Sequence, residues 1–191
     1  MRIISGSLRG RRLHAPPEGV VRPTPDRVRE SVFNILGQKL DDLEFLDLYA
    51  GSGAVGLEAV SRGVRRTVLV ESDPAACEVI RRNIARLGCE ERSELVCRSV
   101  DQALGAMQRS GDGFDVVFVD PPYSDPPGQL AALLARLGET SLVHPDGCVV
   151  LQQKRGRPVA THPCFSARKP RNYGITSILV FDRLSTREPP A

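Results

Sequence analysis

From about residue 44 onward, short apolar runs of strand length alternate with segments whose apolar residues recur at helical spacing. This alternation is typical of βαβ units, in which helices join parallel strands. It therefore predicts an α/β fold built on a mostly parallel sheet. The expected strands are 45–49, 67–70, 94–97, 114–119 and 148–151, and the expected helices are 57–61, 74–87, 101–109 and 129–137.

Both ends of the chain depart from this alternation. Residues 3–13 contain two glycines and predict a small β-hairpin, after which Thr24 as N-cap and Pro25 in the first turn predict an amphipathic helix. Near the C-terminus, 165–169 and 175–183 follow each other without a helix and predict an antiparallel hairpin. The expected organisation is a basic N-terminal extension (1–40), a main domain (41–185) and a loose tail (186–191).

The composition excludes several classes of protein. Hydrophobic residues make up 41% and charged residues 26%, which is ordinary for a globular protein, and no apolar run approaches the roughly 20 residues that span a bilayer. Because no signal peptide is visible, we expect a cytoplasmic protein without membrane contact. The three histidines and five cysteines show no metal-ligand spacing, so no metal site and no disulfide are expected. The cysteines are expected to be reduced residues of the core: Cys77, Cys89, Cys97, Cys148 and Cys164.

The charge is distributed unevenly along the chain. Residues 1–40 hold eight Lys/Arg and three Asp/Glu (net +5), residues 41–150 hold ten and eighteen (net −8), and residues 151–191 hold eight and two (net +6). Basic segments on either side of an acidic one indicate a polyanionic partner. Single arginines in such segments are also commonly just solvated, and Thr24 is more simply explained as a helix cap.

A glycine-rich stretch follows the first expected strand. In 47–56, Gly51 and Gly53 allow a tight turn and the approach of a ligand, and Gly56 allows close packing of the next helix on the sheet. Glu71 ends the second strand, where a carboxylate can meet ribose hydroxyls. This pattern indicates an adenosine cofactor, and by itself it leaves NAD(P) and S-adenosylmethionine open.

The tetrapeptide Asp120-Pro121-Pro122-Tyr123 directly follows the apolar run 114–119. Two prolines donate no N–H bond, so the Asp120 carboxylate and the Pro121 carbonyl form a rigid group of acceptors, beside which Tyr123 can stack on a base. Such acceptors suit the exocyclic amine of a nucleobase. The tetrapeptide resembles the motif of amino-group methyltransferases that use S-adenosylmethionine, whereas a dehydrogenase would leave it unused.

Several motifs together resemble the RsmD family of bacterial methyltransferases, which modify N2 of one guanine in 16S ribosomal RNA. The resemblance covers most of the chain and weakens after about residue 150. The segments that carry it are Arg2 to Gly6, Leu8 to Arg11, Arg22-Pro23-Thr24 with Asp26 to Glu30, Phe33-Asn34, Leu46-Asp47 with Ala50 to Gly53, and Phe118 to Tyr123.

The resemblance implies a Rossmann-like methyltransferase fold with a mostly parallel seven-stranded sheet, S-adenosylmethionine as the cofactor, and a monomer that acts on 16S ribosomal RNA in an assembling small subunit. Ser99 stands where the family often has Asp or Asn, with Asp101 as a substitute, and Gln152 stands where an acid is common. The candidate residues are Asp120, Pro121 and Tyr123 for catalysis; Asp47, Ala50, Gly51, Ser52, Gly53, Glu71, Ser99, Val100 and Asp120 for the cofactor; and Arg9, Arg11, Arg12, Arg22, Arg27, Pro122 and Tyr123 for the substrate.

Two other functions stay open at this point. A DNA adenine or cytosine amino-methyltransferase would share the glycine loop and the Asp-Pro-Pro-Tyr motif, but the sequence shows no target-recognition domain. A noncatalytic RNA-binding assembly factor could keep the same fold as a relic. The retention of Gly51, Gly53, Glu71 and Asp120 argues against that alternative.

Overall fold

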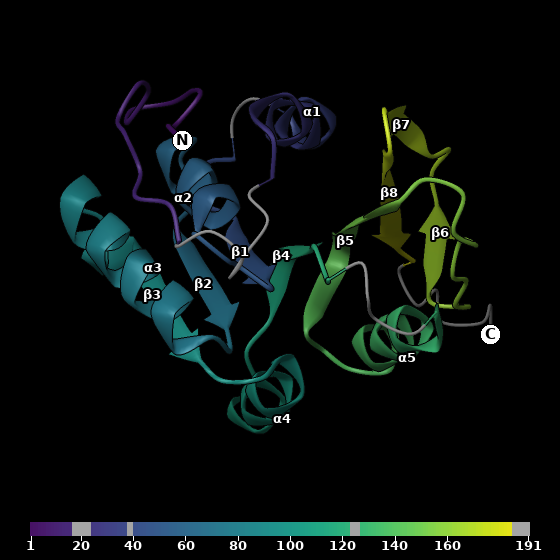
Figure 1. Cartoon of the computed structure of the whole chain (residues 1–191). Coiled ribbons are helices and arrows are strands. Elements are labelled where there is room, and N and C mark those ends of the chain that lie inside the picture. Colours follow the sequence, from purple (N-terminus) through teal and green to yellow (C-terminus); the bar gives the residue numbers. More distant parts are fainter. Residues whose placement is uncertain (17–23, 38–39, 123–126, 185–191) are drawn as a thin grey trace. The chain divides into compact units, whose positions relative to one another are not determined.

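The computed structural model describes residues 1–16, 24–37, 40–122 and 127–184 (Figure 1). The chain divides into two compact units, Met1–Ala106 and Met107–Ala191. Three of the predicted features, Arg22, Tyr123 and the tail 186–191, lie outside the described residues. The predicted domain boundary near residue 40 stays a prediction.

The first unit contains three parallel strands in the order β3-β2-β1. Helix α2 (Ala54–Ser61) connects β1 (Glu44–Leu48) to β2 (Arg66–Glu71), and helix α3 (Pro74–Leu87) leads from β2 towards β3 (Ser93–Cys97). Nearly all residues of β1 and β2 are buried, as expected for strands with both faces covered. The alternation of strands and helices in the sequence therefore forms the βαβ units that it predicts.

Local capping explains why α3 has the predicted bounds. The Asp73 side chain accepts a hydrogen bond of 2.9 Å from the Ala76 N–H, Pro74 occupies the first turn, and Gly88 ends the helix at φ +66°. A short 3-10 turn, η1 (Glu90–Arg92), then leads into β3. Helix α4 (Val100–Ser110) follows β3.

The N-terminal helix α1 (Asp26–Leu36) begins one residue later than predicted. Pro25 occupies the N-cap position at φ −57° and ψ 145°, and its carbonyl accepts the N–H groups of Val28 and Arg29. The extended ψ of Pro25 keeps this residue outside the helix, so the prediction of Thr24 as the N-cap is wrong. The buried face of α1 includes Val28, Val32 and, unexpectedly, Arg29.

The first 14 residues, here called the N-terminal segment, reverse direction and lie along α2 (Figure 1). The predicted hairpin is present as one antiparallel bridge between Arg2 and Arg12, with the Ile3 N–H donating to the Arg11 carbonyl at 3.0 Å. Gly6 and Gly10 both adopt φ +82°. Of these two glycines, Gly6 is the one at which an added Cβ would collide with backbone, namely with the Ser61 carbonyl. Gly6 therefore permits the close approach of the N-terminal segment to α2.

Replacing Gly6 by alanine should detach the N-terminal segment from α2. Both Gly6→Ala and Gly10→Ala introduce a side chain at φ +82°, which costs about 1–2 kcal/mol. Gly10→Ala meets nothing within 4 Å, whereas Gly6→Ala adds a collision worth about 1–3 kcal/mol more. Urea unfolding of the two variants should show this difference, and equal losses of stability would contradict the steric role of Gly6.

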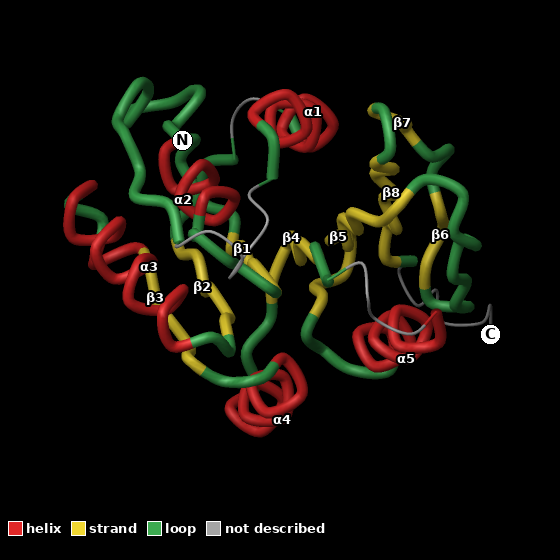
Figure 2. Tube along the Cα trace, in the orientation of Figure 1, coloured by secondary structure: helices red, strands yellow, loops and turns green. Residues whose placement is uncertain are grey.

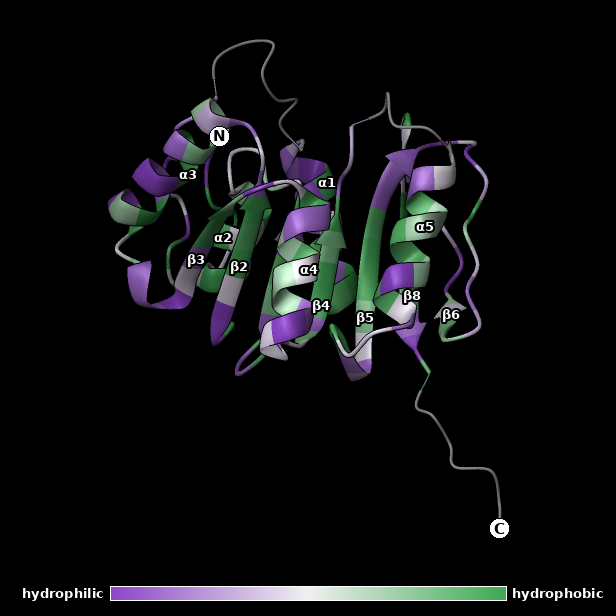
Figure 3. Ribbon diagram, turned by 90° about the horizontal axis from the view of Figure 1, so that it is seen from below, coloured by the Kyte–Doolittle hydropathy of each residue, from purple (hydrophilic) through white to green (hydrophobic). Residues whose placement is uncertain are grey.

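In the second unit, the strand order is β4-β5-β8-β6. β4 (Phe114–Val119) pairs in parallel with β5 (Val143–Lys154), which pairs antiparallel with β8 (Thr176–Arg183), and helix α5 (Pro127–Gly138) lies between β4 and β5 in the chain. Figure 3 shows hydrophobic residues along β4 and the middle of β5, where nearly all side chains are buried.

The predicted C-terminal hairpin is confirmed, with its first strand divided in two. β6 (Phe165–Ala167) and β7 (Arg171–Tyr173) both pair antiparallel with β8 (Figure 2). Pro170 lies between the two short strands and has no N–H to continue the ladder. The seven expected strands thus become eight in the described residues, and the predicted α/β class with a C-terminal antiparallel hairpin is confirmed.

The five cysteines are free thiols. Cys77, Cys89 and Cys148 are buried as predicted, and burial raises the pKa of Cys77 to about 12 and that of Cys148 to about 11. The core prediction is wrong for Cys97, which is exposed, and Cys164 is half-buried. In the described parts of the chain, none of the helices is long and apolar enough to cross a membrane, and no group of three acidic, His or Cys side chains could hold a metal ion.

Candidate active site

The glycine loop leaves the carboxyl end of β1 as a tight reversal. Tyr49, Gly51 and Gly53 have φ values of +63°, +59° and +75°. The Ala50 N–H donates to the Val70 carbonyl at 2.9 Å, and the Ala50 carbonyl accepts the Gly53 N–H at 2.8 Å. These two bonds and the positive φ values define the tight turn of the loop. An added Cβ at Gly53 would meet the side chains of the core, so this glycine serves backbone geometry and packing more than ligand approach.

Glu71, at the carboxyl end of β2, holds the glycine loop from the neighbouring strand. Its Oε2 accepts the Gly51 N–H at 2.8 Å, and its Oε1 accepts the N–H groups of Ser72 and Asp73 at 2.7 and 2.9 Å. A carboxylate has about four acceptor positions, and these three bonds leave one on Oε2. The predicted contact with ribose hydroxyls is compatible with this arrangement and stays a prediction.

Asp47 holds the far end of the loop. It is 1% exposed, and its Oδ2 accepts the N–H of Gly56 at 2.8 Å. An added Cβ on Gly56 would lie 3.2 Å from this same oxygen and about 3 Å from Leu69, which confirms that Gly56 allows close packing on β2. The immediate role of Asp47 is thus to fix the start of α2, and any contact with a cofactor stays a prediction.

The third support of the glycine loop is Asn83, a residue that the sequence analysis did not select. Asn83 is completely buried on α3, and its Nδ2 donates to the Ser52 carbonyl at 3.0 Å. Ser52 itself is 5% exposed, and its hydroxyl donates to the Met1 sulfur at 3.6 Å. A polar residue on the apolar face of α3 was the available signal, but its partner cannot be inferred from the sequence.

These contacts allow a test of whether the first unit could hold an adenosine cofactor. The glycine loop turns at left-handed glycines, and its Gly51 N–H donates to the Glu71 carboxylate, which has one acceptor position left. Asp47, Glu71 and Asn83 hold the loop from three different elements of the fold. The donor and acceptor set therefore fits a nucleoside with ribose hydroxyls.

Ser99 and Val100 stand at the start of α4. The Ser99 hydroxyl accepts the Gln102 N–H at 3.3 Å, and the Ser99 carbonyl accepts the Ala103 N–H at 3.0 Å. Ser99 therefore caps the helix, which by itself accounts for a serine at this position. Its predicted contact with adenine, and that of Val100 in the first turn, stay predictions.

Asp120, Pro121 and Pro122 belong to the second unit, where they follow the last residue of β4. Asp120 is half-buried, Pro121 is buried and Pro122 is exposed. This placement at the carboxyl end of a parallel strand matches the sequence prediction, because ligands of open α/β sheets bind at such ends. The approach of Asp120 to the glycine loop stays a prediction.

The predicted substrate arginines have different environments. Arg9, Arg12 and Arg27 are exposed on the N-terminal segment and α1. Arg11 is also exposed, but its Nη1 donates to the Leu87 carbonyl at 2.9 Å, near the C-terminus of α3. Arg11 therefore stabilises a helix end, where a positive charge is favourable, and Arg9 and Arg12 are the better candidates for contacts with phosphates.

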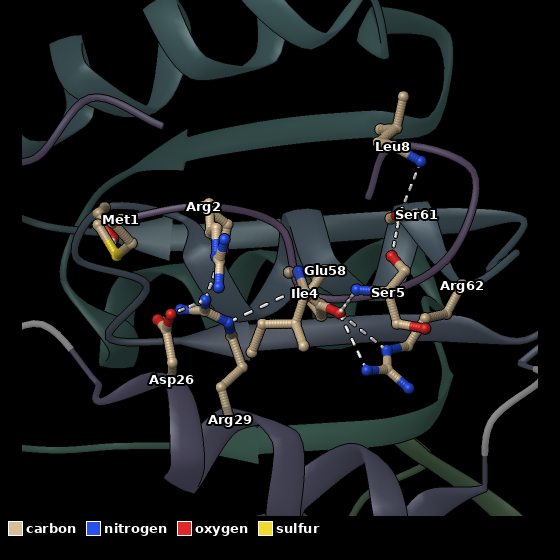
Figure 4. A network of polar contacts seen from close by, with 12 residues as sticks. Met1, Arg2, Ile4, Ser5, Leu8, Asp26, Arg29, Glu58, Ser61 and Arg62 are labelled. Carbon is tan, nitrogen blue, oxygen red and sulfur yellow. Dashed lines mark hydrogen bonds and ion pairs between the residues drawn. The ribbon is translucent and has the colours of Figure 1, made fainter. Parts of the chain in front are cut away.

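A buried charged cluster joins the N-terminal segment to α1 and α2 (Figure 4). Glu58 is completely buried and accepts the N–H groups of Ile4 and Ser5 at 2.7 and 2.9 Å. It also lies 3.0 Å from an Arg62 nitrogen and 3.7 Å from Nε of Arg29. Burial lowers the pKa of Arg29, while Asp26 and Glu58 oppose that shift. This cluster was not predicted from the sequence, although Glu58 in an otherwise apolar helix was a signal.

The chain matches a known protein family. The model of the family described as "Conserved hypothetical protein 95" matches residues 1–182. A Bacillus subtilis protein named "Putative rRNA methyltransferase YlbH" is 35% identical over 96% of this chain and 99% of its own length. "Ribosomal RNA small subunit methyltransferase D" of Haemophilus influenzae is 32% identical over 95% of this chain and 93% of its own.

A solved structure shares the fold over nearly the whole chain. The Escherichia coli protein described as "Putative methyltransferase yhhF" superposes with a TM-score of 0.83 at 32% identity, covering 96% of this chain and 98% of its own. The similarity therefore includes the N-terminal segment as well as the glycine loop and the C-terminal hairpin.

Proposed function

This chain belongs to the conserved hypothetical protein 95 family, and we propose that it transfers a methyl group from S-adenosylmethionine to the exocyclic N2 amine of a guanine in 16S ribosomal RNA. The observation that carries the proposal is the Asp120-Pro121-Pro122 sequence at the carboxyl end of β4, in a chain whose glycine loop is hydrogen-bonded to Glu71. Similarity to ribosomal RNA methyltransferases over almost the full length supports the substrate class.

The guanine amine is a weak nucleophile because its lone pair is delocalised into the ring. Acceptance of its two hydrogens by the Asp120 carboxylate and the Pro121 carbonyl would favour a pyramidal nitrogen and stabilise the positive charge that develops on it. Asp120 or water would then take the proton. S-adenosylmethionine supplies the methyl group as an electrophile on a positively charged sulfur, and Glu71 and the glycine loop are the residues that would hold it.

The base must leave its stack to reach these acceptors. Unstacking costs a few kcal/mol, and stacking on an aromatic side chain returns roughly 1–3 kcal/mol per base. Tyr123 is the residue proposed for this stacking, with Pro122 beside it. Neither step requires a metal ion.

The finer parts of the proposal rest on the family alone. These are the choice of guanine 966, its N2 amine, an assembling small subunit as the substrate in the cytoplasm, and the monomeric state. The test combines purified protein, isotopically labelled S-adenosylmethionine and 16S ribosomal RNA from a strain that lacks this activity. Mass spectrometry should find one N2-methylguanine in that RNA and no label in duplex DNA. Label in DNA, or on another base, would overturn the proposed substrate.

Removing two exposed arginines, Arg9 and Arg12, should weaken RNA binding because their contacts with RNA phosphates are lost. For Arg9→Gln/Arg12→Gln, we expect the logarithmic salt slope of RNA binding to flatten by about 1.4, because each phosphate contact contributes about 0.7 on single strands. The affinity for the cofactor should stay unchanged. The matched control Arg81→Gln/Arg82→Gln removes the same charge from α3, where both arginines pair with Glu78. Equal effects of the two double variants would mean that only net charge matters.

A further inference from the structure

Asn83 connects two parts of the first unit that lie far apart in the sequence. Its Oδ1 accepts the His14 N–H at 2.7 Å, while its Nδ2 donates both to the His14 carbonyl at 3.0 Å and to the Ser52 carbonyl at 3.0 Å. These partners define the orientation of the Asn83 amide, because a flipped amide would place its oxygen against the His14 and Ser52 carbonyl oxygens. One fully buried side chain thus holds the end of the N-terminal segment and the glycine loop together.

The two ends of this connection have different expected ligands. The N-terminal segment carries Arg9 and Arg12, both exposed and both proposed to contact RNA phosphates. Ser52 lies between Gly51 and Gly53, in the loop proposed to hold the cofactor. A second link, from the Ser52 hydroxyl to the Met1 sulfur, joins the same two parts. Any rearrangement of the segment on RNA binding would therefore act on the backbone of the loop.

We propose that Asn83 is a positioning residue that couples the N-terminal segment to the glycine loop, so that binding of RNA to the segment and binding of cofactor to the loop strengthen each other. This inference rests on the proposed function. Glu71 supports the loop at Gly51, and Asp47 supports it at Gly56. Asn83 supports the loop at Ser52 and also bonds the N-terminal segment at His14. Coupling of this kind is reciprocal: each ligand changes the affinity of the other by the same factor.

His14 contacts Asn83 only through its backbone N–H and carbonyl. One variant can therefore remove the His14 side chain alone, and a matched variant can remove the N–H. His14→Ala removes an exposed imidazole and keeps both backbone bonds. His14→Pro removes the N–H that donates to Asn83 Oδ1 and leaves the bond from Asn83 to Ser52 in place. A third variant, Asn83→Leu, keeps the branched shape and the number of side-chain heavy atoms and removes all three bonds. Circular dichroism and thermal unfolding identify any variant that fails to fold.

The readout is the dissociation constant of S-adenosylhomocysteine, measured by calorimetry with and without saturating 16S ribosomal RNA transcript. In the wild type and in His14→Ala, RNA should tighten binding about fivefold or more, within the usual range of allosteric coupling. In His14→Pro, the constant without RNA should stay within about twofold of the wild type while the effect of RNA becomes smaller, because the bonds from Asn83 to the His14 carbonyl and from Ser52 to Met1 remain. In Asn83→Leu, binding without RNA should weaken about tenfold and should not respond to RNA.

Hydrogen exchange adds a readout that needs no ligand. In the free protein, the backbone amides of 51–53 should exchange faster in Asn83→Leu than in the wild type, because the Ser52 carbonyl has lost its partner. Unchanged exchange in a folded Asn83→Leu, or full coupling in His14→Pro, would overturn the inference. A wild type that binds cofactor and methylates RNA without any effect of RNA on cofactor affinity would also overturn it. If the wild type neither binds nor methylates, the proposed function itself fails.

Discussion

Asp120→Ala should reduce the rate of methyl transfer by about 10³-fold, within the range measured when a single group that stabilises transition-state charge or transfers a proton is removed. The carboxylate is the charged member of the proposed acceptor pair. Alanine leaves the Pro121 carbonyl as the other acceptor and provides no group to stabilise the charge that develops on the amine. Affinity for S-adenosylmethionine should change by a few-fold at most. Single-turnover transfer to 16S ribosomal RNA measures the first quantity, and calorimetry measures the second.

Two further variants make this result specific. Asp120→Asn keeps an acceptor oxygen but loses the charge, so its rate should fall between those of the wild type and Asp120→Ala. Asp115→Asn removes a carboxylate near the start of β4 rather than after its end, and it should keep the wild-type rate. Wild-type turnover in Asp120→Ala, or an equal loss in Asp115→Asn, would refute the proposed role of Asp120.

Glu58→Ala should lower the free energy of unfolding by about 3–5 kcal/mol, the usual cost of removing one partner from a buried ion pair. Glu58 is completely buried and is the carboxylate shared by Arg29 and Arg62, which are also buried. In the described residues, Nε and Nη1 of Arg29 have no hydrogen-bond partner, so the cluster is short of acceptors even in the wild type. Losing the carboxylate leaves two guanidinium groups and two backbone N–H groups poorly compensated.

The control is Glu44→Ala, which removes the carboxylate of a surface ion pair. Glu44 and Arg65 are 2.8 Å apart, closer than Glu58 and either arginine, but the Arg65 side chain is 65% exposed. Pairs of this kind contribute about 0–1 kcal/mol. Urea denaturation therefore tests whether burial or distance decides the contribution. Similar losses for the two variants would contradict the role of burial, and hydrogen exchange at Ile4 and Ser5 should rise only in Glu58→Ala.

The regular elements followed from local sequence because their causes are local. Apolar runs, a proline in the first turn and a glycine after the last turn gave the bounds of α3 without any tertiary information. The β4 strand was also predicted with its observed bounds. The error at the start of α1 arose where two local preferences compete: Pro25 is compatible with the N-cap and with the first turn, and the observed ψ of 145° decided for the N-cap.

The glycine turn and the acid that ends β2 were predictable from the sequence, whereas the side chains that support the turn from α3 and the N-terminal segment from α2 were not. Gly51, Gly53 and Glu71 were found because a left-handed turn and an acid at a strand end leave a mark on the sequence. Asn83 and Glu58 were missed, although both are buried polar residues in apolar helix faces. Their backbone partners lie 31 to 69 positions away, and a backbone partner is not encoded by the identity of its side chain.

The order of strands and helices, the tight turn of the glycine loop and the place of the Asp-Pro-Pro segment after β4 were determined by the sequence, because periodicity, glycine and proline act on the chain within a few residues. The tertiary structure alone decided that the N-terminal segment lies against α2 and α3 and is tied to the glycine loop. That arrangement depends on a glycine that permits contact with the Ser61 carbonyl and on buried side chains that satisfy distant backbone groups. Such long-range bonds become visible only when the folded chain brings the donors and acceptors together.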